Sequence, residues 1–221
     1  MHIGLIGGIG PAATDFYYRR LIAKAAAQKI NLDLTIVHAD SPTLLANMAA
    51  NAHEAQCAIY AVLTERLKAA GADCVVITSI SGHFPIDQFS KISPLPVIDL
   101  TVTLRDWLHQ NNFFSVGLIG TKTVMQTAMH GKLSGINVII PDGTELDRVH
   151  ETYVNLALSG TPTNQHRETF FSVGEKLVRE HGASAILLGG TDLNAAFEGQ
   201  IPPFDVIDCA GIHIDAIASK L

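Results

Sequence analysis

The residues most clearly suited to ligand binding form the glycine-rich stretch Gly7-Gly8-Ile9-Gly10-Pro11, which follows an apolar run at residues 3–6. An amphipathic segment begins at Thr14. This pattern predicts a buried strand, a tight turn and a helix that starts at the carboxyl end of the strand. Glycine lets backbone N–H groups approach a ligand, and a helix N-terminus favours an anion. The alternative is a turn that binds nothing, because the spacing matches neither a Walker loop nor a dinucleotide-binding motif.

Small polar residues follow three further apolar runs, at residues 73–78, 115–120 and 185–189. Ligands of open parallel sheets bind beyond the carboxyl ends of the strands, so these residues are candidates for the same site as the glycine turn. The expected binding residues are Gly8, Ile9, Gly10, Ser81, Thr121, Lys122, Thr123 and Thr191.

Two parts of the sequence repeat each other. Residues 116–121 repeat the pattern of residues 3–8, and residues 181–188 resemble residues 70–77. Two similar halves that arose by duplication explain both repeats. We therefore expect two pseudo-symmetric α/β lobes with parallel sheets and a cleft between them. The first lobe is expected to span residues 1–98 plus 209–221, and the second residues 99–208.

The periodicity of apolar residues predicts alternating strands and helices, as in parallel βαβ units. Expected strands are residues 3–7, 32–38, 73–78, 97–99, 115–120, 136–140, 185–189 and 204–208. Expected helices are residues 12–28, 52–70, 100–110, 123–134, 144–158, 165–181 and 212–221, with a further helix start near residues 84–85. Residues 40–43 are expected to form a loop.

Composition excludes several classes of protein. The chain of 221 residues is 48% hydrophobic with a net charge of −6 and no basic patch, which argues against nucleic-acid binding. No apolar run is long enough to span a membrane, and no signal peptide is recognisable. The three cysteines (Cys57, Cys74 and Cys209) are odd in number and far apart, which fits a reducing cytoplasm. No metal-binding spacing of histidines occurs, so no metal is expected.

The motifs together resemble the cofactor-independent aspartate/glutamate racemases over nearly the whole chain. Residues 7–14 are similar to the opening Gly-Gly-Met-Gly-Pro-x-Ala-Thr of that family, and residues 116–123 to its second-half strand and Thr-rich loop. Residues 189–192 are similar to its Gly-Cys-Thr-Glu, and Asp208 with Ile212-His213 to its C-terminal Asp and Ile-His. The resemblance implies two pseudo-symmetric α/β domains and a small amino-acid substrate, with no pyridoxal phosphate or other cofactor.

The sequence departs from this family at the two catalytic positions. The family uses one thiol on each side of the substrate α-carbon, one to remove a proton and the other to deliver one. The matching positions here are Ser79 and Gly190. A serine hydroxyl is a poor base without an activator, and glycine carries no proton. Two cations of active aspartate-type members also have no match, since the local equivalents are Leu44 and Leu158.

Two other residues near these positions could take part in proton transfer. His83 could activate Ser79 or act as an acid or base, or it could be a hydrogen-bonded structural histidine. Asp192 could be a second base, although a helix cap is favoured. Cys209 lies near a strand end, and His213 is expected to support the last loop.

The sequence therefore predicts a racemase-like protein that binds a small carboxylate or amino acid in the cleft, with impaired two-thiol chemistry. The alternatives are a catalytically silent binding protein, or a lyase or isomerase that uses His83 and Ser79 in place of thiols. A homodimer is compatible with the sequence.

Overall fold

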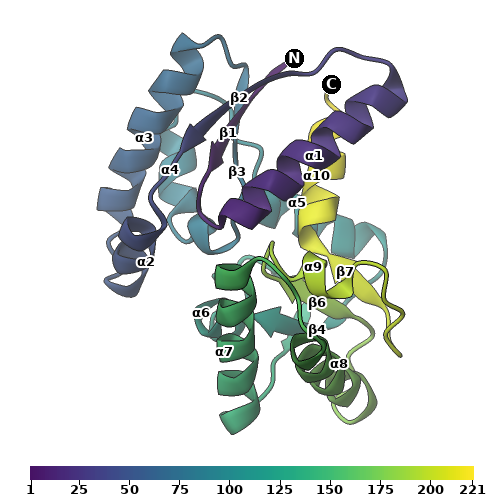
Figure 1. Cartoon of the computed structure of the whole chain (residues 1–221). Coiled ribbons are helices and arrows are strands. Elements are labelled where there is room, and N and C mark those ends of the chain that lie inside the picture. Colours follow the sequence, from purple (N-terminus) through teal and green to yellow (C-terminus); the bar gives the residue numbers. More distant parts are fainter. The chain divides into compact units, whose positions relative to one another are not determined.

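The computed structural model describes residues 1–221 and contains two compact units. Unit 1 consists of Met1–Leu100 together with His213–Leu221, and unit 2 consists of Thr101–Ile212. Each unit contains one parallel sheet with helices packed against it (Figure 1). The prediction of an α/β fold with two parallel sheets is confirmed.

The sheet of unit 1 has the strand order β2-β1-β3. Its strands are β1 (His2–Gly7), β2 (Asp33–His38) and β3 (Cys74–Ile77). The expected strand at residues 97–99 is reduced to one bridge, between Val97 and Val75. The segment before it, Pro94-Leu95-Pro96, has two residues without an N–H group, and helix α5 (Leu100–Gln110) begins directly after residues 97–99, so the ladder stays short.

Helices cover both faces of this sheet. A Cβ atom added to Gly4 would lie 2.9 Å from the side chain of Leu67 in α3 (His53–Ala69), and one added to Gly7 would lie 2.4 Å from the side chain of Thr14 in α1 (Pro11–Gln28). Because successive residues of a strand point to opposite faces, α3 and α1 must lie on opposite sides of the sheet. Figure 1 shows this arrangement of unit 1.

The C-terminal helix α10 (Cys209–Ala218) passes from unit 2 into unit 1, where it contacts α1. Lys24 forms an ion pair with Asp215. His213 is fully buried; Tyr17 Oη lies 2.8 Å from its Nδ1, and its Nε2 lies 2.9 Å from the carbonyl oxygen of Ile98. A carbonyl oxygen can only accept, so Nε2 carries the proton and Nδ1 accepts from the Tyr17 hydroxyl.

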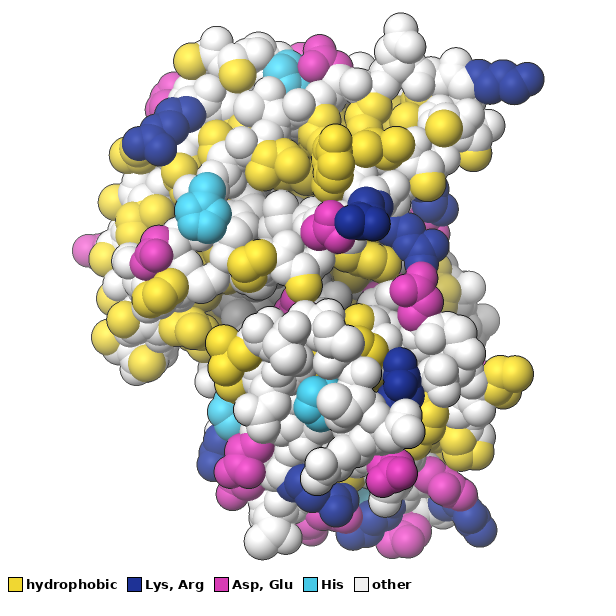
Figure 2. Space-filling view, in the orientation of Figure 1, with side chains coloured by type: hydrophobic (Ala, Val, Ile, Leu, Met, Phe, Trp, Pro, Cys, Tyr) yellow, Lys and Arg dark blue, Asp and Glu magenta, His cyan; other side chains and the backbone are white.

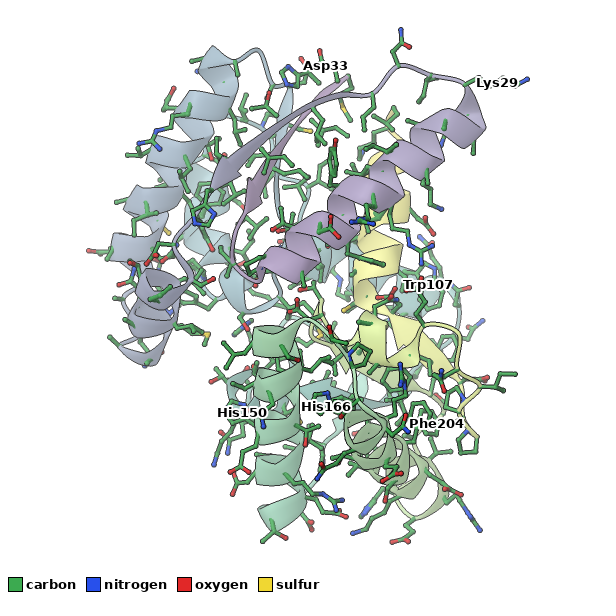
Figure 3. The ribbon with its side chains drawn as sticks, in the orientation of Figure 1. Lys29, Asp33, Trp107, His150, His166 and Phe204 are labelled. Atoms are coloured by element: carbon green, nitrogen blue, oxygen red, sulfur yellow. The ribbon has the colours of Figure 1, made fainter.

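The sheet of unit 2 has the order β5-β4-β6-β7. Its strands are β4 (Ser115–Gly120), β5 (Asn137–Ile139), β6 (Ile186–Gly189) and β7 (Val206–Asp208). Helices α7 (Gly143–Ser159) and α8 (Asn164–Arg179) pack on each other and on β4. In Figure 3, His150 lies on α7, His166 lies in the first turn of α8, and Phe204 lies beside α8, where its ring packs over Gly174.

The strand pairing of the two units follows one scheme. Ile6 of β1 is the register partner of Ile77 in β3, and Ile119 of β4 is the register partner of Leu188 in β6. The sequence repeats align Ile6 with Ile119 and Ile77 with Leu188, and the register of the two sheets agrees with this alignment. The bridge between Val75 and Val97 matches the start of the β6–β7 pairing, so unit 1 has a single bridge where unit 2 has its fourth strand.

Two further segments differ from the sequence prediction. Residues 40–43, expected as a loop, begin helix α2 (Ser41–Ala49), because the Asp40 side chain accepts from the Thr43 N–H and caps the helix. The helix expected at residues 123–134 ends early, as α6 (Lys122–Gln126). Residues 128–131 have positive φ, which no α-helix can accommodate.

The remaining helices are short, apart from α5. They are η1 (Ser81–His83), α4 (Ile86–Ile92), α5 (Leu100–Gln110) and α9 (Asn194–Phe197). None of the helices in the structure combines the length and apolar character that crossing a bilayer requires.

Candidate functional site

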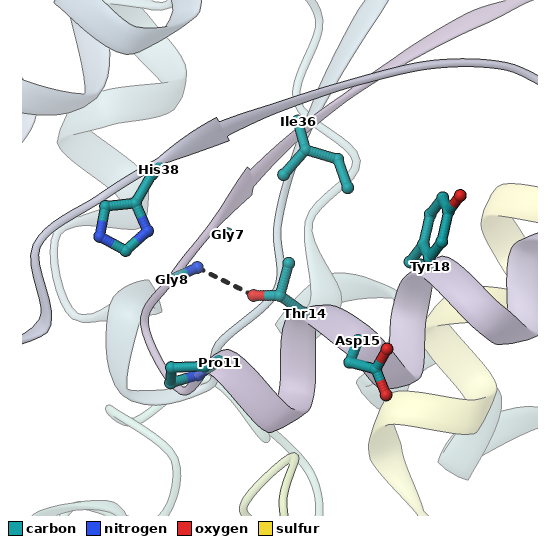
Figure 4. A pocket seen from close by; sticks show the side chains of 8 residues that line it. All are labelled: Gly7, Gly8, Pro11, Thr14, Asp15, Tyr18, Ile36 and His38. Atoms are coloured by element: carbon teal, nitrogen blue, oxygen red, sulfur yellow. Dashed lines mark hydrogen bonds between the residues drawn. The ribbon is translucent and has the colours of Figure 1, made fainter.

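The glycine turn after β1 is held in one conformation by its neighbours. Gly8 and Gly10 have φ values of 92° and 85°. The Gly8 N–H donates to Thr14 Oγ1 at 2.8 Å (Figure 4), and Ser41 Oγ donates to the Gly8 carbonyl at 2.6 Å. A Cβ atom on Gly8 would lie 2.3 Å from His38 Nδ1. Both the dihedral angles and the lack of space therefore require glycine at this position.

The N-terminus of α1 leaves backbone donors available for a ligand. Gly10 is the N-cap and no side chain caps the helix, while Pro11 at the first position has no N–H. The Gly8 N–H is used by Thr14, whereas the N–H groups of Ile9 and Gly10 take no part in the bonds that fix the turn. Unbonded N–H groups at the start of an 18-residue helix favour an anion.

Thr14 joins this turn to the end of β3. Its hydroxyl lies 3.3 Å from the Thr78 hydroxyl, and Thr78 Oγ1 donates to the Ile6 carbonyl, also at 3.3 Å. Thr78 directly precedes Ser79. The expected proximity of the glycine turn to the Ser79 loop is therefore present within unit 1, as the carboxyl ends of neighbouring parallel strands dictate.

Ser79 and His83 are both buried, and His83 has no exposed surface. The Ser79 hydroxyl accepts from the Gly82 N–H at 3.3 Å, so its own proton remains available for donation. His83 Nδ1 lies 2.6 Å from the Ser79 carbonyl oxygen, and His83 Nε2 accepts from the Leu100 N–H at 3.3 Å. These contacts let His83 brace the loop through its backbone, and Asp99 Oδ1 lies 3.9 Å from His83 Nε2. The geometry thus matches the structural role for His83; it does not show His83 activating the Ser79 hydroxyl. Ser81 lies in η1, partly exposed.

A pocket of about 230 Å³ opens beside the glycine turn on the side of β2. Its lining comprises Gly7, Gly8, Pro11, Thr14, Asp15, Tyr18, Ile36 and His38, as Figure 4 shows. Figure 2 shows hydrophobic side chains gathered on one face of unit 1. In the pocket lining, Tyr18 and Ile36 are exposed hydrophobic residues. Asp15 pairs with Arg19 at 2.8 Å, so its charge is partly compensated.

In unit 2 the second predicted position, Gly190, follows directly after β6. A Cβ atom added there would lie 2.4–2.8 Å from Cε2, Cζ and Oη of Tyr153. The Tyr153 hydroxyl donates to Asp192 Oδ2 at 3.0 Å. The space that a side chain at residue 190 would need is therefore filled by the Tyr153 ring. Burial, and next the charge of Asp192, raise the pKa of Tyr153 well above its usual value, so the phenol stays protonated.

The other expected residues of unit 2 lie at the ends of β4 and β6, which are paired through Gly120 and Gly189. Thr121 caps α6 by accepting from the Val124 N–H. Lys122 is exposed and pairs with Asp147 at 2.6 Å, and its N–H donates to His150 Nδ1 at 3.2 Å. Thr123 is partly exposed, and Thr191 is buried beside Gly190. Lys122 would have to leave Asp147 to contact a ligand.

The cysteines are all free and buried. Cys209 donates to the Leu188 carbonyl, and burial raises its pKa well above the usual value. A buried neutral thiol that is already hydrogen bonded is a poor base. Cys209 therefore does not replace the missing thiols in this geometry.

Tyr153 is the residue that sequence reasoning missed. It lies on a buried position of α7, far in sequence from the β6 loop, and nothing in its local pattern distinguishes it from a core aromatic residue. Only the combination of Gly190 without a side chain and Asp192 two residues later could have suggested a bulky polar partner from elsewhere in the chain.

Two parallel α/β units with the same pairing scheme, each with small polar residues at its strand ends, define a protein of the racemase fold. The model of the Asp/Glu/hydantoin racemase family matches residues 6–217, and the chain belongs to this family. A candidate Asp/Glu racemase of Yersinia pestis is 25% identical, with a TM-score of 0.86 over 100% of this chain and 99% of the other.

More distant solved structures share the fold. An aspartate racemase homologue of Pyrococcus horikoshii is 23% identical with a TM-score of 0.81, each chain being covered to 99%. The glutamate racemase of Francisella tularensis, solved with D-glutamate, is 18% identical with a TM-score of 0.68, over 100% of this chain and 80% of the other.

Proposed function

We propose that this protein binds a small carboxylate or acidic amino acid at the carboxyl ends of its strands, without a pyridoxal cofactor, and does not catalyse racemisation by the two-thiol route. The loss of racemase chemistry is supported by one observation: the Tyr153 ring occupies the space that a side chain at residue 190 would need. With Ser79 at the other position, neither a thiolate base nor a thiol acid is present.

The binding part is supported by the glycine turn of unit 1. Its fixed geometry, the uncapped start of α1 and the free N–H groups of Ile9 and Gly10 suit one carboxylate group. The membership of the chain in a family of amino-acid racemases, and the D-glutamate in the related Francisella structure, point to the same class of ligand.

The test combines thermal unfolding with isotope exchange. We expect L- or D-aspartate, glutamate or succinate to raise the melting temperature, since a ligand at 100 times its Kd adds about 2.7 kcal/mol of stability. In heavy water, the α-proton signal of the bound amino acid should persist. The absence of stabilisation by all these compounds would contradict binding. Rapid loss of the α-proton with inversion would contradict the loss of racemase chemistry.

A further inference from the structure

Strand β2 forms the outer edge of the sheet of unit 1, and one side of its backbone has no partner in the chain. The Ala39 N–H, directly after β2, donates to the Gly7 carbonyl of β1 at 2.8 Å. The backbone groups of successive residues point to opposite edges of a strand, so Leu34, Ile36 and His38 point away from β1. The N–H and carbonyl groups of these three residues form no hydrogen bond within the chain.

This edge also lacks the features that keep sheet edges apart. Edge strands that stay in water are usually protected by a lysine, a proline or a bulge. Strand β2 contains no lysine or proline, its pairing with β1 is regular over six residues, and its one carboxylate, Asp33, stands at its start. An unprotected edge of this kind is a template for pairing with another chain.

The surface beside the edge is apolar. Ile36 is 41% exposed, and Tyr18 and Ile22 of α1 are 44% and 42% exposed. Ile36 pairs in register with Leu5, two residues before Gly7, so its side chain lies on the face of the sheet that α1 covers. Tyr18 and Ile36 both line the pocket of about 230 Å³ shown in Figure 4. The edge and the apolar side chains therefore form one continuous surface of unit 1.

We propose that β2 pairs in antiparallel fashion with β2 of a second copy of this chain, about a two-fold axis through Thr35. Outward-pointing residues bond to one another in such a pair, so Leu34 of each copy pairs with Ile36 of the other. The two sheets join into one, and an axis perpendicular to the sheet keeps both α1 helices on the same face. The exposed Tyr18 and Ile22 of each copy then face their counterparts and leave water.

The charges at the two ends of β2 favour a second copy in this register. Lys29 precedes the strand and Asp40 follows it, and both are exposed. Antiparallel pairing about Thr35 brings Lys29 of one copy beside Asp40 of the other, and it places Asp33 opposite the uncharged Val37. The next possible axis, through Ile36, would instead bring Asp33 beside Asp40 of the other copy, and like charges in that position are destabilising.

The first test is the mass of the full chain in solution, measured by sedimentation equilibrium over a range of concentrations. We expect twice the chain mass of 23.6 kDa for the wild type. Ile36→Lys places a charge on the proposed pair and should weaken association about 10-fold or more. Val62→Lys is the matched control, because Val62 is 54% exposed on α3, on the opposite face of the same sheet, and it should leave the association unchanged.

The second test is cross-linking at the axis. Thr35 would lie directly opposite its own copy, where Cβ atoms are about 4.5–5.5 Å apart, and the three native cysteines are buried. Thr35→Cys should therefore form a disulfide-linked dimer under mild oxidation, whereas Val62→Cys should stay monomeric on a non-reducing gel. A monomeric wild type would overturn the proposal, and so would a dimer that Ile36→Lys leaves intact or a Thr35→Cys variant that does not cross-link. If Ile36→Lys does not fold, the cross-link still decides.

Discussion

At Gly190, the lack of a side chain and the place of the Tyr153 ring depend on each other. Gly190→Cys, the obvious way to restore a thiol, should destabilise the protein by about 1–3 kcal/mol, because the new Cβ would overlap the ring. Urea unfolding measures this cost. Ser79→Cys combined with Gly190→Cys should likewise gain no racemase activity while Tyr153 is present.

The matched experiment adds Tyr153→Val, which clears the space. Gly190→Cys should then cost much less in the Tyr153→Val background than in the wild type, and the difference is the coupling energy of a double-mutant cycle. Equal costs in both backgrounds would show that the ring does not determine the residue at position 190.

His213 makes stability depend on pH. Burial, and next the neighbouring His83, lower the pKa of His213 to about 3, so the folded protein holds a neutral ring. The unfolded chain binds a proton near pH 6.5, and the folded protein binds it only near pH 3. The contribution of His213 to the free energy of unfolding is therefore fully present above pH 6.5. It declines between pH 6.5 and 3, by up to about 1.4 kcal/mol per pH unit.

Urea unfolding at several pH values between 7.5 and 4.5 should reveal this slope. In His213→Gln the slope should be shallower over the same interval, although the variant is less stable at pH 7.5. His181→Gln, at an exposed histidine of unit 2, should retain the wild-type slope. A slope that His213→Gln does not alter would assign the acid sensitivity to other groups.

At the scale of the elements, the turn between β1 and α1 depends on Thr14. Thr14→Val keeps the shape of the side chain but removes the acceptor of the Gly8 N–H and the contact with Thr78. We expect a loss of about 1–3 kcal/mol in stability and weaker binding of carboxylates, because the turn is no longer fixed. Calorimetry and urea unfolding measure both effects.

Thr14→Ser retains the hydroxyl and is the control for this change. It should restore most of the affinity and stability that Thr14→Val loses. Equal ligand binding by Thr14→Val and the wild type would show that the glycine turn is not part of the site.

The sequence predicted most elements because their signals are local. Strand β4 has the predicted bounds, since Val116, Leu118 and Ile119 form a compact apolar run. Helix α6 was predicted too long because the apolar residues Met129 and Leu133 continue the helical period, although the backbone at residues 128–131 has turned to positive φ. Tertiary burial of Met129 there outweighs helical propensity.

The candidate site was predicted only in part, because some of its contacts join residues that are far apart in the sequence. The glycine turn and the strand-end polar residues follow from adjacent sequence. The hydrogen bonds that decide their availability join residues far apart, such as Gly8 with Ser41 and Asp192 with Tyr153. The expected roles of Ser79, Gly190, His83 and Asp192 toward a ligand remain predictions.

At the scale of the whole molecule, residues 213–221 complete unit 1 from the far end of the chain. Deleting them removes the fully buried Ile217, the nearly buried Ile214, and the partners of Tyr17 and Lys24. Burial of each isoleucine side chain stabilises the folded protein by about 1.5–3 kcal/mol. Hydrogen exchange should then show faster exchange in β1 and α1, with protection retained in β4 and β6. Uniform loss of protection would mean that the two units unfold as one.

This order of segments has a consequence during synthesis. A ribosome makes most of unit 1 first, yet residues 213–221 of that unit are made only after every residue of unit 2. Domains fold as units during translation at about 5–20 residues per second, so unit 2 can fold while the first hundred residues are still incomplete. During those seconds Tyr17 and Lys24 of α1 lack their partners His213 and Asp215 on the nascent chain.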